Sequence, residues 1–149
     1  MEKNTYPVEE WKVTEEKFVK HWNYRNETTF ALSNGYIGTR GTFDEGYPFT
    51  VDEGLEGNFI NGFYESEHIR YGEWNFGFPE TSQSLLNLPN LKKTTIEVNG
   101  EMFDLKAGEI VEYSRSLLMN EGIVVRNVVW KSPKGKEVKA TFKRLVSLA

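Results

Sequence analysis

Short strand-forming segments separated by strong turn signals fill the second half of the chain, and they restrict the possible folds more than any other feature. Residues 94–105 contain the dipeptide Asn99-Gly100 with strand formers on both sides. A two-residue type I′ turn requires positive φ angles at both central positions, which Asn and Gly adopt most readily. With this turn, Glu97 lies opposite Met102. The segment is therefore predicted to be an antiparallel β-hairpin.

Longer strands are expected after this hairpin. They are predicted at residues 110–118, 123–130 and 137–143. The last two are joined by residues 132–135, in which Pro133 and Gly135 occupy the positions that these residues prefer in a type I turn. Apolar and polar residues alternate over the last segment, as expected for a strand with one buried and one solvated face.

The first half of the chain is less regular. Residues 11–13 are predicted to form a first strand, and residues 15–21 a short helical turn. Residues 30–42 are interpreted as a hairpin with Asn34-Gly35 as its turn.

The middle of the chain is rich in glycine, proline and asparagine. Residues 44–58 are expected to form a loop, residues 59–64 a strand with a glycine bulge, and residues 65–91 a long excursion with short strands. Short strands, repeated turns and the absence of βαβ spacing together predict an all-β fold. We expect an antiparallel β-sandwich with at most one or two short helices.

Composition narrows the functional classes. At 149 residues the chain can form one domain with a core, and its net charge of −4 with dispersed basic residues favours neither nucleic acid nor an anionic membrane as partner. Cysteine is absent, and the histidines are His21 and His68, so we expect no metal and no cofactor. The N-terminus lacks the apolar core of a signal peptide, and no apolar run is long enough to span a membrane, so a cytoplasmic location is expected.

The C-terminal residues 145–149 are apolar and strand-like, with no polar tail behind them. An unpaired hydrophobic edge favours association. We therefore expect residues 1–149 to be one domain truncated at its C-terminal end, within a larger protein. A terminal strand paired inside the sheet is the alternative.

Residues 25–41 combine three glycines, two arginines and an Asn-Gly dipeptide. Glycine permits tight turns or close approach of two backbones. The glycines are Gly35, Gly38 and Gly41.

The two arginines of this segment are Arg25 and Arg40, and carboxylates lie nearby at Glu27, Asp44 and Glu45. A buried pair between an arginine and a carboxylate would fix the path of the chain. We favour such an architectural role for the segment over direct contact with a ligand.

Several motifs follow one another in a recognisable order. They are Arg25-Asn26-Glu27-Thr28, Asn34-Gly35-Tyr36-Ile37-Gly38-Thr39-Arg40-Gly41, and residues 59–65, 86–90, 114–119, 130–136 and 144–148. In this ordered set the chain resembles the N-terminal region of the glycoside hydrolase family 65 disaccharide phosphorylases, which act on kojibiose, maltose, nigerose or trehalose. Position 33 is Ser where family members often have Gly, which affects only the local turn.

The resemblance implies that residues 1–149 are the N-terminal β-sandwich, part of a larger super-sandwich, of a multi-domain enzyme whose catalytic (α/α)₆ barrel is not in this chain. It implies inverting phosphorolysis of an α-linked glucoside by inorganic phosphate, giving β-glucose 1-phosphate. Phosphate is already an anionic nucleophile, so such a site needs one acid and donors for phosphate but no base. In the family these groups belong to the barrel, so no catalytic residue is assigned here, and the chain alone is predicted to be inactive.

An aromatic-rich loop at residues 71–78 is the best candidate for contact with sugar. Tyr71 and Trp74 offer ring faces for a pyranose, and Glu73 and Asn75 offer hydrogen bonds to its hydroxyls. The alternative, which we favour, is that these aromatics plug the sandwich or its interface with the barrel.

Three functions therefore remain for the chain. The first is a non-catalytic domain that serves as scaffold, docks on the rest of its own polypeptide and contributes to a homodimer. The second is a freestanding carbohydrate-binding module, which should have a flat aromatic platform. The third is a self-sufficient glycosidase, for which no convergent pair of carboxylates is evident.

Overall fold

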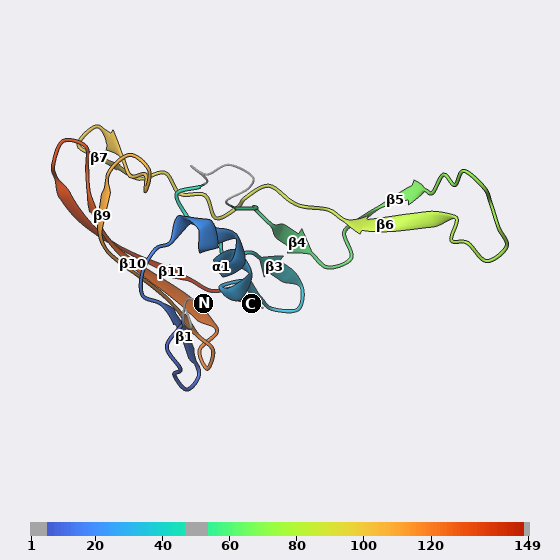
Figure 1. Cartoon of the computed structure of the whole chain (residues 1–149), viewed down its shortest axis with the longest axis horizontal. Helices are drawn as coiled ribbons and strands as arrows, with labels where there is room; N and C mark the ends of the chain where they lie inside the picture. The colour runs from blue at the N-terminus through green and yellow to red at the C-terminus, as the bar shows by residue number, and fades with distance from the viewer. Residues whose placement is uncertain (1–5, 47–53, 148–149) are drawn as a thin grey trace.

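A four-stranded antiparallel sheet forms one side of the molecule in the computed structural model, which describes residues 6–46 and 54–147 (Figure 1). The strand order is β1-β9-β10-β11, and every neighbouring pair is antiparallel. The strands are β1 (Lys12–Glu15), β9 (Glu109–Leu118), β10 (Ile123–Lys131) and β11 (Glu137–Arg144).

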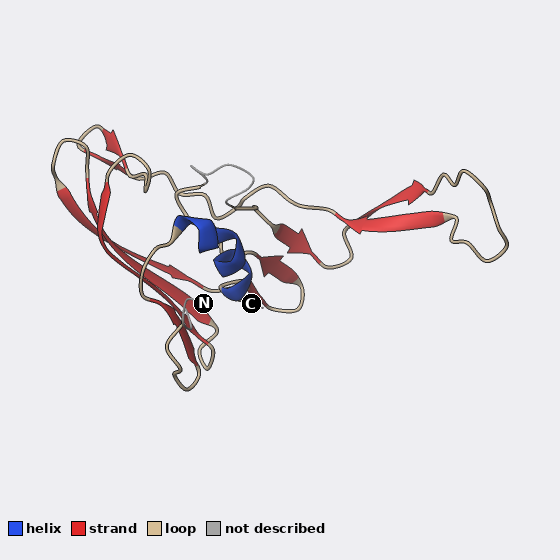
Figure 2. Ribbon diagram, in the orientation of Figure 1, coloured by secondary structure: helices blue, strands red, loops and turns tan. Residues whose placement is uncertain are grey.

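The remaining elements are short. A three-stranded antiparallel sheet contains β2 (Leu32–Ser33), β3 (Ile37–Thr39) and β4 (Asn58–Ile60), and two hairpins pair β5 (Tyr64–His68) with β6 (Thr81–Leu85) and β7 (Glu97–Val98) with β8 (Glu101–Met102). A 3₁₀ helix η1 (Lys20–Trp22) leads into one α-helix, α1 (Asn23–Thr29). Figure 2 shows that strands dominate the described chain, as predicted for an all-β antiparallel fold.

The core lies on one face of the main sheet. Val124, Arg126, Val128 and Trp130 of β10 are buried on this face, because alternate side chains on a strand share a face, and Val129 is buried as well. Trp130 packs against Phe103, and its ring lies 5.2 Å from that of Phe103. A second cluster on the same face ties α1 and β2 to the sheet through Phe30, Leu32 and Val124.

The opposite face of the main sheet carries polar side chains. Thr141 donates a hydrogen bond to Asn127 (2.9 Å), and Asn127 reaches Ser114 (3.5 Å), so neighbouring strands are linked across this face. Within the described chain, the other elements therefore pack on one face of the main sheet, and the opposite face carries polar side chains.

The local turn predictions for the second half are confirmed. Asn99 and Gly100 have φ angles of 52° and 76°, and Glu97 pairs with Met102. At residues 132–135 the backbone N–H of Gly135 donates to the carbonyl of Ser132 (2.8 Å), which closes the expected turn.

The helical turn predicted for residues 15–21 begins later, at residue 20. β1 continues to Glu15, and the helical residues are 20–29, so the motif at Arg25 is helical. Glu15 is drawn into the sheet by its register opposite Arg115, a partner that no local pattern reveals. Trp11 precedes the strand, with a φ angle of 57°.

Three other predictions need correction. The hairpin at 30–42 is present, but its turn is formed by Gly35 and Tyr36, since only Gly35 of the pair Asn34-Gly35 has positive φ (86°) and Asn34 pairs with Ile37. The strand expected over 59–64 is split between β4 and β5 at residues 61–63. β11 ends at Arg144, so residues 145–147 are not a strand. The predicted loop at 44–58 lies partly outside the described residues.

Candidate functional site

Helix α1 presents one polar edge to the interior of the protein. Asn23, Asn26 and Glu27 are spaced by three and four residues, which places them on one face of a helix, and all three are fully buried. Asn23 donates a hydrogen bond from Nδ2 to Oε1 of Glu27 (2.9 Å). Asn26 donates from Nδ2 to Oε1 of Glu15 on β1, which joins the helix to the sheet.

Glu15 and Arg115 form a buried ion pair beneath this helix. Nε and Nη2 of Arg115 lie 2.9 Å and 2.8 Å from Oε2 of Glu15. Tyr113 donates its hydroxyl to the same oxygen (3.1 Å), and burial raises the pKa of Tyr113 above its ordinary value, so it stays a neutral donor. Arg115 also donates from Nη1 to the carbonyl of Gly41 (2.8 Å), which ties the motif to β9.

Glu27 is held by backbone and side chain together. Oε2 of Glu27 accepts the N–H of Leu55 (2.8 Å) and lies 3.6 Å from Nη2 of Arg40. Burial raises the pKa of Glu27, and the hydrogen bond from Leu55 and the charges of Arg40 and Arg115 oppose that rise. The expected pairing of Arg40 with a nearby carboxylate is thus present. Arg40 further donates to the carbonyls of Leu55 (3.0 Å) and Tyr24 (3.1 Å).

Arg25 behaves differently from the expectation. Its guanidinium lies over the rings of Trp22 and Tyr6, 4.9 Å and 5.5 Å from their centres, and Nε donates to Asn26 (3.4 Å). Within the described residues it forms no ion pair with Glu27, Asp44 or Glu45. Helix α1 turns Arg25 towards the aromatic rings and Glu27 towards the interior, since they are two residues apart.

Guanidinium groups and aromatic rings alternate across the inner face of the main sheet. Phe43 lies between Arg115 (5.2 Å) and Arg126 (4.4 Å), measured from guanidinium carbon to ring centre. The stack continues to Phe30 beyond Arg115 (4.3 Å) and to Phe142 beyond Arg126 (4.1 Å). These cation–π contacts hold residues 30–43 against β9, β10 and β11.

Two of the carboxylates expected to pair with Arg25 or Arg40 lie beside the arginines of the sheet instead. Glu45 forms a bidentate pair with Arg126, and Asp44 accepts from Nη2 of Arg144 (2.6 Å). Each of the three arginines on the inner face of the sheet therefore has its own carboxylate, a condition for keeping a charge buried.

The motif glycines have separate roles. Gly35 forms the turn described above, and a Cβ at Gly41 would lie 2.7 Å from the carbonyl oxygen of Phe30, so the backbones approach too closely for a side chain. Gly38 has no positive φ angle, and a Cβ added there would lie 3.8 Å from the nearest atom, so neither a turn nor a close backbone approach requires glycine at this position. Asn34 accepts the N–H groups of Tyr36 (2.9 Å) and Ile37 (2.7 Å) through Oδ1.

Lys92 fastens the far end of the motif. Its Nζ donates to the carbonyl of Arg40 (2.8 Å) and to the hydroxyls of Thr42 (3.0 Å) and Thr39 (3.3 Å). Burial lowers the pKa of Lys92 to about 8, with a further lowering by the charge of Arg144. The role of Lys92 was not visible in the sequence.

Glu15, Arg115 and Arg126 were also missed. A signal was available, because Arg115 and Arg126 stand at positions of β9 and β10 where the alternation calls for buried apolar residues. A charged residue at such a position requires a buried partner.

The network offers no space for a substrate. The cavity beside Arg115 and Arg126 has a volume of about 10 Å³, room for about one water molecule. The described residues contain no group of three or more His, Cys, Asp or Glu able to hold a metal. No helix among them is long and apolar enough to cross a membrane.

Wider depressions lie elsewhere on the main sheet. One of about 480 Å³ lies between residues 16–18 and the start of β9. Another, of about 300 Å³, crosses β9, β10 and β11 and is lined by polar residues such as Ser114 and Asn127 together with apolar residues such as Val129. The aromatic residues that line these depressions are Phe18, which is half-buried, and Tyr113, which is buried, so they do not form the flat exposed platform expected of a carbohydrate-binding module.

The aromatic loop at 71–78 forms the tip of the β5–β6 hairpin, far from the ion-pair network (Figure 1). Tyr71 packs against Phe78, with ring centres 4.9 Å apart, and donates its hydroxyl to the carbonyl of Pro79 (3.0 Å). Trp74 is 66% exposed, and Glu73 and Asn75 are exposed beside it. None of the four predicted contact residues lines one of the depressions above.

Comparison with known proteins identifies the family. The family description "Glycosyl hydrolase family 65, N-terminal domain" matches residues 13–149. An α,α-trehalose phosphorylase from Thermoanaerobacter brockii is 47% identical over 98% of this chain and 19% of its own length, and a maltose phosphorylase from Bacillus subtilis is 33% identical over 97% and 18%. A solved structure of a putative kojibiose phosphorylase from the human microbiome matches 96% of this chain and 18% of its own, with a TM-score of 0.83 and 26% identity. The chain spans about a fifth of the length of these relatives and belongs to glycosyl hydrolase family 65, as its N-terminal domain.

Proposed function

We propose that this chain is the non-catalytic N-terminal domain of an inverting disaccharide phosphorylase and serves as a scaffold that docks on the catalytic part of the same polypeptide. The observation that carries the proposal is that the motif residues make buried contacts within the domain. Glu27, Arg40 and Gly41 are committed to buried contacts that hold α1 and β2–β3 on the main sheet. Groups fixed in this way support a fold and do not meet a substrate.

The parent enzyme would cleave an α-linked disaccharide with inorganic phosphate to give β-glucose 1-phosphate and a free sugar. Its relatives are named as trehalose, maltose and kojibiose phosphorylases, which supports this class of reaction. Inversion requires an acid for the leaving oxygen and attack by phosphate from the opposite face of the sugar. We assign the acid and the phosphate site to residues outside this chain. We further propose that the parent enzyme is a homodimer in the cytoplasm.

The experiment is an assay of the isolated chain and of the full-length parent with phosphate and each of trehalose, maltose, kojibiose and nigerose. Glucose 1-phosphate should form with the parent for at least one sugar and should not form with the isolated chain for any. Turnover by the isolated chain would contradict a non-catalytic role, and a parent that hydrolyses these sugars without consuming phosphate would contradict the phosphorylase.

Binding of sugar by the isolated chain is the alternative function, and the depression of about 300 Å³ across β9, β10 and β11 favours it. Calorimetry with the same four disaccharides tests this alternative. Heats that saturate at millimolar or lower concentration, and that disappear in Asn127→Ala, would establish it.

A further inference from the structure

The β5–β6 hairpin and its tip, residues 63–86, form an arm that extends away from the body of the protein (Figure 1). Five residue pairs join its two strands. All residues from 63 to 85 are exposed except the half-buried Ile69. A two-stranded hairpin that nothing covers is marginally stable in water. The arm therefore lacks the cover that an element of this kind needs.

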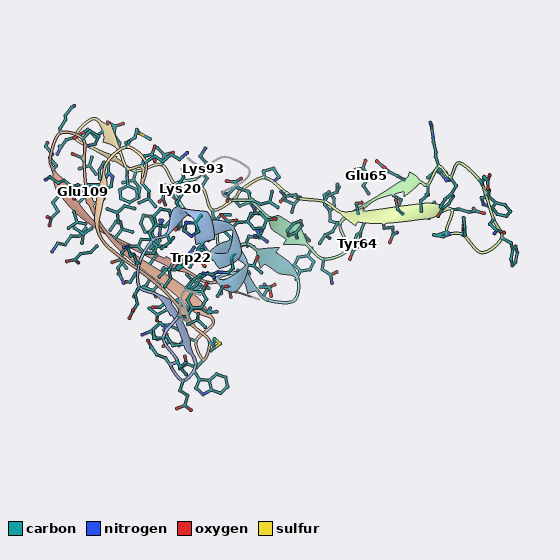
Figure 3. All side chains as sticks on the ribbon, viewed as in Figure 1. Lys20, Trp22, Tyr64, Glu65, Lys93 and Glu109 are labelled. Atoms are coloured by element: carbon teal, nitrogen blue, oxygen red, sulfur yellow. The ribbon has the colours of Figure 1, made fainter. Side chains whose placement is uncertain are left out.

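Exposed apolar side chains are concentrated on the arm. Phe76 is 92% exposed and Trp74 is 66% exposed at the tip, and Tyr64 and Leu85 are nearly half exposed at its base. Figure 3 shows Tyr64 and Glu65 on β5 of the arm, outside the packed body. Aromatic groups gathered on one projecting segment indicate a contact surface, because water disfavours such a patch.

The arm also carries an excess of negative charge. Its carboxylates outnumber its single arginine by four to one, the charged residues being Glu65, Glu67, Arg70, Glu73 and Glu80. Five carboxylates of the described body form ion pairs with Lys or Arg, whereas the four carboxylates of the arm are exposed. A complementary surface would present an apolar recess surrounded by Lys or Arg.

The base of the arm is firmly attached. The N–H of Leu88 donates to the carbonyl of Asn58 (2.7 Å) on β4, and the N–H of Asn58 donates to Oδ1 of Asn87 (2.9 Å). Nδ2 of Asn87 then donates to the carbonyl of Glu56 (3.0 Å). The arm continues directly from the strands that carry the family motif, so its direction is set by the body of the domain.

The relatives of this chain are much longer than the chain itself, so they contain further residues on which the arm can dock. The structural match to the kojibiose phosphorylase covers 96% of this chain and 18% of the longer chain. The unmatched 4% of this chain corresponds to about six residues, which is fewer than the arm contains. Most of the arm is thus aligned in a polypeptide about five times as long. Building on the proposed function, we propose that the arm docks on the catalytic part of its own polypeptide, with Trp74 and Phe76 in an apolar recess rimmed by basic residues.

Photo-cross-linking in the full-length parent tests this proposal. The photoreactive amino acid p-benzoylphenylalanine replaces Phe76 in one variant and Trp11 in the control, because Trp11 is also exposed (62%) but precedes β1 on the body. We expect position 76, and not position 11, to join within one polypeptide to residues that follow this domain. A cross-link between two polypeptides would show instead that the arm covers a second copy, and a yield no higher than at position 11 would overturn the proposal.

A second measurement separates docking from contact with sugar. The double variant Trp74→Ser/Phe76→Ser should raise the rate of proteolytic cleavage between the domains by at least roughly tenfold, since two buried aromatic groups are lost, whereas Trp11→Ser should leave it unchanged. An altered KM for the sugar acceptor in Trp74→Ala, with an unchanged cleavage rate, would assign the tip to sugar contact and overturn docking. Turnover by the isolated chain is a different result, which would refute the proposed function and not the arm contact.

Discussion

Arg115 and Glu15 lie 100 residues apart in the chain, yet each is the main partner of the other. They meet because β1 and β9 pair in a register that places them opposite one another. Removing either from water is costly, and their attraction offsets that cost only when the pair is complete. The pair therefore favours one register of β1 over its neighbours, because a shift by one residue would turn Glu15 to the opposite face and leave Arg115 buried without its carboxylate.

Replacing Arg115 with Met should lower the free energy of unfolding by about 3–5 kcal/mol, because it leaves Glu15 charged and buried. In the double variant Glu15→Gln/Arg115→Met the loss should be clearly smaller than the sum of the two single losses. Urea unfolding of the chain measures all three. Lys12→Met is the control, because Lys12 forms an exposed pair with Glu9 (2.7 Å) that should contribute at most about 1 kcal/mol. Additive losses for Glu15 and Arg115 would show that they do not act as a pair.

Lys92 makes the stability of the chain depend on pH. Its pKa is about 8 in the folded chain and 10.5 in its ordinary state. Between these values the unfolded chain binds a proton that the folded chain does not, so the contribution of Lys92 to stability rises as pH rises from 8 towards 10.5. The free energy of unfolding of the wild type relative to Lys92→Met should therefore increase over this range. Lys93→Met removes the same group from an exposed neighbouring position and is the control. A constant difference between wild type and Lys92→Met would contradict the lowered pKa.

At the scale of elements, α1 and β2–β3 act as one unit that is clamped to the main sheet. The N–H of Gly41 donates to the carbonyl of Glu27 (2.8 Å), and the carbonyl of Gly41 accepts from Arg115. Phe30, at the end of α1, lies in van der Waals contact with Gly41 and beneath Arg115. The family motif thus encodes the junction between a helix, a hairpin and a sheet.

Gly41→Ala should destabilise the chain by about 1–3 kcal/mol, because the new methyl group would meet the backbone of Phe30. Gly38→Ala is the matched substitution in the same motif, where no atom lies closer than 3.8 Å, and it should change stability by less than about 1 kcal/mol. Chemical unfolding midpoints of the two variants provide the comparison. Equal losses would mean that close packing at Gly41 is not the reason for a glycine there.

At the scale of the whole molecule, the described chain divides into a packed body and an arm. The body places α1, β2 and the aromatic stack on one face of the main sheet, and the arm extends beyond it. Buried polar contacts are concentrated in the body, whereas the arm is held mainly by its own strand pairing. The two parts should therefore differ in stability against local opening.

Amide hydrogen exchange should reveal this difference. In the isolated chain, amides of β5 and β6 should exchange much faster than those of β9 and β10, because the hairpin opens without unfolding the body. In the full-length parent the arm amides should become protected, while β9 and β10 stay protected in both. Equal protection of the arm in both proteins would show that it needs no partner.

Local chemistry determined much of this protein before tertiary contacts were known. The turns at Asn99-Gly100 and residues 132–135 depend on backbone preferences of the residues themselves, and the alternation in β11 depends on one solvated face. The ordered motifs also identified the family correctly. These features were predictable because their physical causes act within a few neighbouring residues.

Only the tertiary structure decided the helix at residues 23–29, the projection of the arm and the partners of the buried charges. Arg25 and Arg40 look equivalent in the sequence, but α1 turns one onto aromatic rings and leaves the other beside Glu27. Glu15 is a strand residue because it pairs with Arg115 on β9, which is far away in the chain. The partners of a buried charge depend on contacts between distant segments, which no local pattern of residues can specify.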